Sequence, residues 1–218
     1  MSTKELLLYS GGPDSSVLLK YFLEQKKDIL VVYVDMGWCN EVQPSQKIQE
    51  KRVDKLIKYY KKKYGEFDFI KAGITLNIPN CKSTFGTDDQ WGAFLGAVLC
   101  CSYNIKRIWC ASFSYNWANR TALGKTPPYW FLNMKPYLDR GTLNHPNFKD
   151  LQYTIPKFFY NGKKIDKFKT KKEAFNYLDP KVQLLVRSCY SEEKFCGECY
   201  KCKTCIHHKI TDEKGNLI

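Results

Sequence analysis

The sequence lacks a long apolar run and any leading apolar segment of the kind that directs secretion. No stretch approaches the roughly 20 apolar residues that a membrane-spanning helix needs. The polar opening, Met1–Glu5, leads directly into a strand-like run at Leu6–Tyr9. These absences argue against the secreted and membrane-spanning classes, so we expect a cytoplasmic protein with no membrane partner.

Arginine is also scarce, although the chain is strongly basic. Only five of the 35 basic residues are arginine, and the formal net charge is +13. Recognition of phosphates and bases favours the planar guanidinium group, so the lysine excess is more typical of AT-rich coding than of nucleic-acid binding. Direct nucleic-acid binding stays a lesser alternative. It includes a lysine-rich stretch at 157–172, for which a solvated face is the preferred interpretation.

The N-terminal half alternates strand-like and helix-like segments. Apolar runs predict strands over 6–9, 29–34, 67–70 and 107–111. Helical spacing predicts helices over 14–24 and 41–64, and a third follows a capping box at 87–90 with one apolar face formed by Trp91, Phe94, Leu95 and Val98. This alternation predicts an α/β fold, a doubly wound, mostly parallel sheet of Rossmann type with its functional loops at the carboxyl ends of the strands.

The length of 218 residues suits one main domain. We expect this domain to span residues 1–187, with an irregular insert around 114–150 and a further helix at 171–178. Within the insert, Tyr115, Trp117 and Arg120 either stack on a flat base or simply pack a loop. Residues 188–208 are expected to form a small C-terminal metal-binding segment.

A glycine-rich segment joins the first predicted strand to the first helix. It reads Ser10, Gly11, Gly12, Pro13, Asp14, Ser15, Ser16. Glycines permit a tight turn with exposed amides, and the following helix start favours an anion, so the segment predicts a phosphate-binding loop. The three serines offer hydroxyl donors. No lysine follows these glycines in a Gly-Lys-Ser/Thr arrangement, so the segment is not a Walker-type loop; the alternative is a turn with no ligand.

Five of the ten cysteines fall close together near the C-terminus. Cys189, Cys196, Cys199 and Cys202 have the short spacings of a closed tetrahedral structural zinc site. The alternatives are a reactive thiol cluster, an iron–sulfur site, or a ligand set that includes Cys205, His207 or His208. The remaining cysteines are scattered and are expected to be inert packing residues.

Together these two motifs resemble the 7-cyano-7-deazaguanine synthase family of the PP-loop ATP pyrophosphatases. The resemblance rests on Ser-Gly-Gly-x-Asp-Ser near the N-terminus, Ser188-Cys189-Tyr190, and the closing Cys-Gly-Glu-Cys-Tyr-Lys-Cys. It implies ATP-dependent conversion of 7-carboxy-7-deazaguanine and ammonia to the nitrile preQ0, with AMP and pyrophosphate released. It also implies ATP, Mg²⁺ and structural Zn²⁺ as cofactors, and we expect a homodimer.

The resemblance assigns roles to particular residues. Asp14 and Ser15 are implied in catalysis, with Asp14 near the metal. The nucleotide is implied to bind Ser10, Gly11, Gly12, Asp14, Ser15 and Ser16. Asp35, which ends the second predicted strand, is expected at the nucleotide as well; otherwise it is a turn residue.

Two segments depart from the family pattern. Residues 83–90 lack the Val-Pro-Gly-Arg-Asn stretch, and 112–120 lack the Pro-Asp-Cys-Arg segment. Both segments are expected to contact substrate, so a different deazaguanine, another acid or tRNA stays open as the acceptor. A second alternative is an inactive nucleic-acid-binding or regulatory protein that retains the zinc segment.

Overall fold

Five parallel strands form a sheet in the part of the chain that the structure describes. This computed structural model describes residues 4–38, 44–76, 88–111, 135–154 and 171–186. The strands are β1 (Glu5–Leu8), β2 (Ile29–Trp38), β3 (Asp68–Leu76), β4 (Arg107–Cys110) and β5 (Gln152–Thr154). Their spatial order is β3-β2-β1-β4-β5, and every neighbouring pair is parallel. The predicted parallel α/β fold is thereby confirmed.

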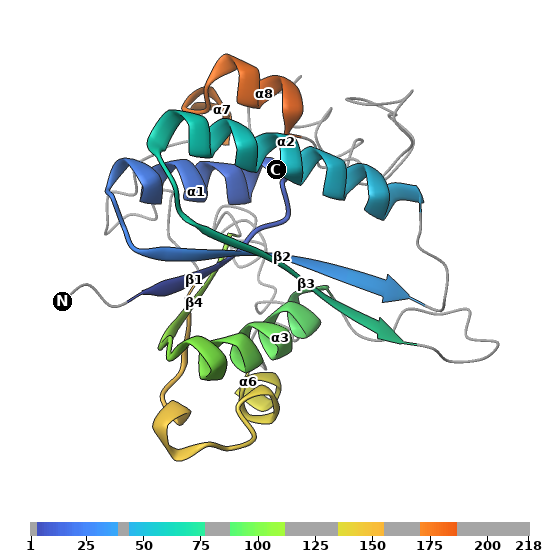
Figure 1. The fold of residues 1–218 in the computed structure, drawn as a ribbon, viewed down its shortest axis with the longest axis vertical. Coiled ribbons are helices and arrows are strands. Elements are labelled where there is room, and N and C mark those ends of the chain that lie inside the picture. The colour runs from blue at the N-terminus through green and yellow to red at the C-terminus, as the bar shows by residue number, and fades with distance from the viewer. Residues whose placement is uncertain (1–3, 39–43, 77–87, 112–134, 155–170, 187–218) are drawn as a thin grey trace, which may run out of the picture.

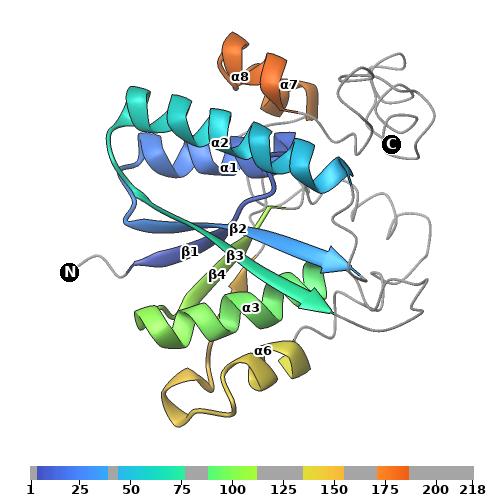
Figure 2. The same cartoon turned by 45° about the vertical axis from the view of Figure 1, so that its right-hand side comes forward.

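Helices cover both faces of this sheet (Figures 1 and 2). One face carries α1 (Pro13–Glu24), α2 (Pro44–Tyr64), α7 (Lys171–Asn176) and α8 (Pro180–Leu185). The other carries α3 (Asp88–Tyr103) and α6 (Lys135–Gly141), and a short 3-10 turn, η1 (Pro146–Phe148), follows α6. The two-sided arrangement agrees with the doubly wound prediction. Among these helices none is long and apolar enough to cross a membrane.

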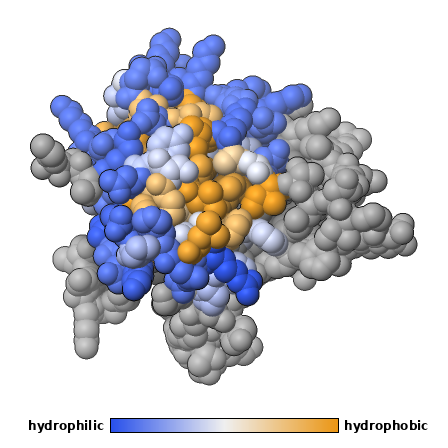
Figure 3. Space-filling view, turned by 60° about the horizontal axis from the view of Figure 1, so that its bottom comes forward, coloured by the Kyte–Doolittle hydropathy of each residue, from blue (hydrophilic) through white to orange (hydrophobic). Residues whose placement is uncertain are grey.

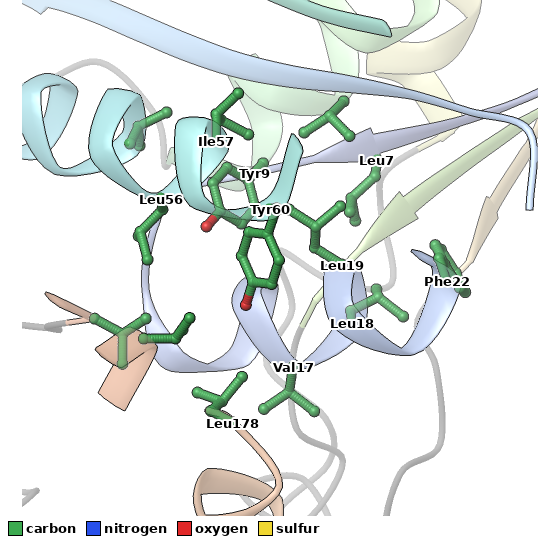
Figure 4. Close-up of a cluster of buried hydrophobic side chains, with 14 of the residues drawn as sticks. Leu7, Tyr9, Val17, Leu18, Leu19, Phe22, Leu56, Ile57, Tyr60 and Leu178 are labelled. Carbon is green, nitrogen blue, oxygen red and sulfur yellow. The ribbon is translucent and has the colours of Figure 1, made fainter. Parts of the chain in front are cut away.

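The two helical layers enclose two separate cores because side chains alternate along a strand. On β2, Val31 and Tyr33 enter the cluster beneath α1 and α2, whereas Leu30 and Val32 enter the cluster beneath α3. The first cluster is shown in Figure 4, where side chains of α1, α2 and β1 meet. Buried strands of this kind are apolar on both faces, which is why they appear in the sequence as continuous apolar runs.

The apolar face predicted for α3 is not the side of the helix that packs on the sheet. Trp91, Phe94, Leu95 and Val98 are only half-buried, whereas the small residues of the helix face the core. A Cβ on Gly96 would lie 3.2 Å from the Ile108 side chain of β4. The helix therefore approaches the sheet through small side chains, and its larger ones lie to the side. Figure 3 is turned so that the lower side of Figure 1 comes forward, and on this face apolar side chains gather at the centre with polar ones around them.

The expected irregular insert is more ordered than predicted over its described part. Residues 135–148 form α6 and η1, and α6 packs against α3 so closely that a Cβ on Gly141 would lie 2.4 Å from the Phe94 carbonyl oxygen. Residues 114–134 of the insert lie outside the described residues. The whole predicted metal-binding segment, 188–208, lies outside them too.

A polar junction attaches α7 and α8 to the first helical layer. Asp179, which precedes α8, accepts from Lys20 Nζ at 3.1 Å, from Lys63 Nζ at 2.7 Å and from Tyr59 Oη at 3.1 Å. Lys20 is 7% exposed and also donates to the Tyr177 carbonyl oxygen at 2.6 Å. One carboxylate thus joins α1, α2 and the C-terminal helices.

Candidate functional site

The glycine-rich segment forms the turn between β1 and α1, as predicted. Gly11 has φ +72°, a left-handed conformation that favours glycine. Gly12 is the N-cap of α1 with extended backbone, and Pro13 is the first helical residue. Gly12 provides no capping side chain, so no side-chain cap occupies the space in front of the first turn. A phosphate group would complete this end of the helix.

Helix α2 packs directly against this loop. A Cβ placed on Gly11 would lie 2.8 Å from Val53 Cγ2. Gln49, one turn earlier on α2, donates from Nε2 to the Ser10 carbonyl oxygen at 2.9 Å. The loop backbone is therefore held from one side by α2, and only glycine fits at position 11.

The three loop serines occupy different environments. Ser10 Oγ lies 3.2 Å from Ser15 Oγ, and Ser15 Oγ donates to the Gly12 carbonyl oxygen at 3.2 Å. Ser16 is fully buried, with its Oγ 3.0 Å from the hydroxyl of Tyr9. Ser10 and Ser15 thus line the turn itself, whereas the Ser16 hydroxyl faces the core and supports the loop from behind.

Two buried tyrosines brace the first turn of α1 (Figure 4). Besides the Tyr9–Ser16 contact, Tyr60 of α2 donates from Oη to the Ser16 carbonyl oxygen at 3.2 Å. Burial raises the pKa of both tyrosines well above the usual range, so both hydroxyls stay protonated at physiological pH. Tyr9 and Tyr60 therefore act as neutral hydrogen-bonding groups that fix where the loop sits.

Two carboxylates belong to the carboxyl end of the sheet. Asp14 is half-buried in the first turn of α1, and its Oδ1 is shielded from solvent. Asp35 lies on β2 three residues beyond Val32, the partner of Leu8 at the end of β1. Its Oδ1 is also shielded and accepts no hydrogen bond from the described part of the chain. By strand alternation it shares the α2 face of the sheet with Tyr33.

Burial and neighbouring charges both affect the ionisation of Asp35. Burial raises the pKa of Asp35, the nearby charge of Glu50 raises it further, and Lys71 lowers it in part. Lys71 is itself bound by Glu50 at 2.9 Å and by Asp54 at 2.8 Å, so its charge is shared. Asp35 is therefore a shielded acceptor with a raised proton affinity.

Taken together, the carboxyl edge offers an anion site beside acceptor groups. The helix start and loop amides suit a phosphate, and a shielded carboxylate oxygen without a hydrogen bond suits a hydroxyl donor or a divalent cation. The residues present therefore fit a nucleotide phosphate together with Mg²⁺. In the described ranges no group of three or more potential metal-ligating side chains is found.

Sequence reasoning missed the supporting residues on α2. Together with Leu56 they follow one another at helical spacing: Gln49, Val53, Leu56 and Tyr60 form one continuous stripe along α2. The spacing of this stripe could be identified in the sequence. Gln49, the polar residue at its start, was the sign that α2 also contacts a polar group outside the core.

Several predicted residues lie outside the described part of the chain. These are the zinc ligands Cys189, Cys196, Cys199 and Cys202, the alternatives Cys205, His207 and His208, and the aromatic set Tyr115, Trp117 and Arg120. Neither a comparison with protein-family models nor one with curated proteins found a match for this chain.

Proposed function

We propose that this chain is an ATP-dependent adenylating enzyme of the PP-loop type, which splits ATP between the α and β phosphates. The observation that supports this most is the loop from Ser10 to Ser16, with its left-handed Gly11 and its uncapped helix start. Such a turn binds anions through backbone amides rather than through a lysine.

The acceptor that we propose is 7-carboxy-7-deazaguanine, with preQ0 as the product. This choice rests on the resemblance carried by the loop and the cysteine segment. A carboxylate is a poor electrophile until its oxygen attacks the α-phosphorus of ATP, which releases pyrophosphate and leaves an acyl-adenylate. Ammonia then displaces AMP from the acyl carbon to give the amide. A second adenylation, on the amide oxygen, then allows loss of AMP to give the nitrile.

The residues of this chain contribute binding and orientation to that chemistry. Loop amides and the hydroxyls of Ser10 and Ser15 hold the departing pyrophosphate, whose developing charge the helix start stabilises. Asp14 stands in the same turn and would hold Mg²⁺, which offsets charge on the phosphates. Asp35 would accept a hydroxyl of the nucleotide ribose at the edge of the sheet.

The deciding experiment measures AMP and pyrophosphate released from ATP–Mg²⁺ by the full chain. Reactions contain or omit 7-carboxy-7-deazaguanine and ammonium, and mass spectrometry follows the base. We expect AMP release that depends on the base, formation of preQ0, and loss of both in Asp14→Ala.

Two other outcomes have definite meanings. AMP release without conversion of the base would retain the adenylating activity and refute the acceptor. Absence of AMP release under every condition, with the protein folded and containing zinc, would refute the enzyme and favour the binding-protein alternative. Asp150→Ala serves as a matched control, because Asp150 is exposed next to β5.

A further inference from the structure

Helix α2 presents a row of lysines to solvent. Lys51, Lys55, Lys58 and Lys62 are all exposed, and their spacing of four, three and four residues places them on one helix face. Over these positions the helix extends roughly 16 Å. We call this row the α2 lysine stripe; it lies opposite the buried stripe that supports the phosphate loop.

The charge of the stripe is not neutralised by its neighbours. The nearest acids are engaged elsewhere, because Glu50 and Asp54 bind Lys71 and Glu66 binds Lys61 at 2.7 Å. Within the described ranges, none of the four stripe lysines forms an ion pair. Four adjacent free ammonium groups create a positive potential that attracts a polyanion.

A shallow groove adjoins the stripe on the side of the edge strand β3. It has a volume of about 480 Å³ and is lined by the apolar side chains of Ile57 and Phe69 and by three lysines, Lys58, Lys61 and Lys62. Asp54 and Glu66 also line it, but each is ion-paired, with Lys71 and Lys61 respectively. Phe69 is half-buried, so part of its ring is accessible. A positive row beside an aromatic side chain is the combination that binds single-stranded nucleic acid, in which bases stack while phosphates meet lysines.

The stripe begins at the same end of α2 as the contact with the candidate site. Gln49, which donates to the Ser10 carbonyl oxygen, precedes Lys51 by two residues but lies on the opposite face of the helix. The row therefore starts at the carboxyl end of the sheet and runs along the outer face of α2. A strand lying on it would be separated from the loop by the helix.

We infer that the α2 lysine stripe binds the sugar–phosphate backbone of a single-stranded nucleic acid, with bases toward the groove at Phe69. A membrane surface fits less well. From Lys51 to Lys63 every exposed position of α2 is charged, so the outer face has no apolar side chain to insert among lipids. Lysine rather than arginine is compatible with contacts to the backbone alone.

The test is fluorescence anisotropy of labelled oligonucleotides with the full chain and without ATP, so that it is independent of the proposed function. The probes are oligo-dT, oligo-rU, an abasic strand and a duplex, each about 20 nucleotides long, a length that exceeds the stripe. Lys55→Gln/Lys58→Gln is compared with Lys26→Gln/Lys149→Gln, which removes the same charge from exposed lysines elsewhere.

The stripe variant is expected to bind oligo-dT and oligo-rU about fivefold more weakly, and the dependence of log K on log salt to flatten by about 1.4. The control variant should retain nearly wild-type affinity. The abasic strand should bind more weakly than oligo-dT at equal charge because it cannot stack. Preference for oligo-rU or for oligo-dT would identify the sugar.

Four results would overturn the inference. They are equal loss in stripe and control variants, equal affinity for abasic and normal strands, tighter binding to duplex, and no binding at low salt. Stripe-dependent binding to phosphatidylserine vesicles with no binding to oligonucleotides would also overturn it and assign the surface to membranes.

Discussion

Gly11 lies so close to Val53 of α2 that an added methyl group at position 11 would come within 2.8 Å of Val53 Cγ2. The contact joins the glycine-rich loop to α2, 42 positions further along the chain. Loop shape is therefore set by tertiary packing as well as by local turn chemistry.

Gly11→Ala is expected to destabilise the protein by roughly 2–3 kcal/mol, because it combines an unfavourable positive φ with overpacking. In a Val53→Ala background the overpacking disappears, and the cost of Gly11→Ala should fall to about 1 kcal/mol. Urea unfolding of the four proteins measures both values. An unchanged cost in the two backgrounds would show that α2 does not restrict the loop.

Tyr60→Phe removes the donor to the Ser16 carbonyl oxygen while keeping the ring. We expect a loss of about 1 kcal/mol in unfolding free energy, typical of one buried hydrogen bond. We also expect weaker ATP binding, measured by titration calorimetry, since the first turn of α1 is less fixed. Tyr64→Phe is the matched control, because Tyr64 stacks on Tyr60 without contacting the loop. Equal effects of the two changes would contradict a specific role of Tyr60.

Asp35→Asn is expected to separate stability from activity. The pKa of Asp35 is raised in the folded state, so its ionised form destabilises the fold at neutral pH. The amide should therefore raise the melting temperature at pH 7. The gain should vanish as pH falls below the ordinary aspartate pKa near ~4, where both states are protonated.

The same Asp35→Asn protein should release less AMP, because a neutral amide oxygen replaces the charged acceptor that we propose for the ribose hydroxyl. Asp54→Asn, also beside Lys71 but exposed, is the comparison. Increased stability with full activity would show that Asp35 is only a strand residue.

Asp179→Asn tests the junction of the C-terminal helices. Burial opposes ionisation of Asp179, yet hydrogen bonds from Lys63 and Lys20 lower its pKa below the usual value. Its carboxylate thus stabilises the fold above the ordinary aspartate pKa, and the contribution is lost as pH falls through the lowered value. We expect a loss of about 3 kcal/mol at pH 7, since the buried Lys20 loses its nearer carboxylate and keeps only Glu24, at 3.8 Å, to balance its charge.

The controls for Asp179→Asn follow from the same pairing. The loss should shrink toward pH 2, and Lys20→Met should restore part of the stability by removing the buried charge. A loss that is constant with pH, or additive with Lys20→Met, would contradict the paired charges. Chemical denaturation at a series of pH values provides all of these comparisons.

Zinc content tests the cysteine segment directly. The four predicted ligands should hold about one Zn²⁺ per chain in elemental analysis, and Cys199→Ser should abolish it. Cys205→Ser should retain the metal. Loss of zinc in Cys205→Ser, with zinc retained in Cys189→Ser, would move the ligand set to the last four cysteines. Bound iron with visible absorbance would instead indicate an iron–sulfur site.

The sheet was predictable because parallel strands buried on both faces appear as apolar runs between helices. The inward face of α3 was not, since periodicity is judged from large residues such as Phe94 and Val98, whereas contact with the sheet is made at Gly96. Short elements such as β5, with the polar sequence Gln152–Thr154, exist through pairing with β4 and have no local signal.

The helix α8 was missed although its start was marked. Asp179 followed by Pro180 is the usual beginning of a helix, with proline in the first turn. At the site, the loop from Ser10 to Ser16 followed from glycines and position alone. The bracing by Tyr60 depends on where α2 packs, which sequence spacing does not specify.

The central position of β1 has a consequence for synthesis of the chain. Leu7 pairs with Val31 on one side and with Trp109 on the other, about 100 residues later. At ~5–20 residues per second, one edge of this apolar strand stays open for roughly 5–20 seconds before its second partner leaves the ribosome. Protection of that edge, by a chaperone or by the ribosome itself, is then a requirement for high yield.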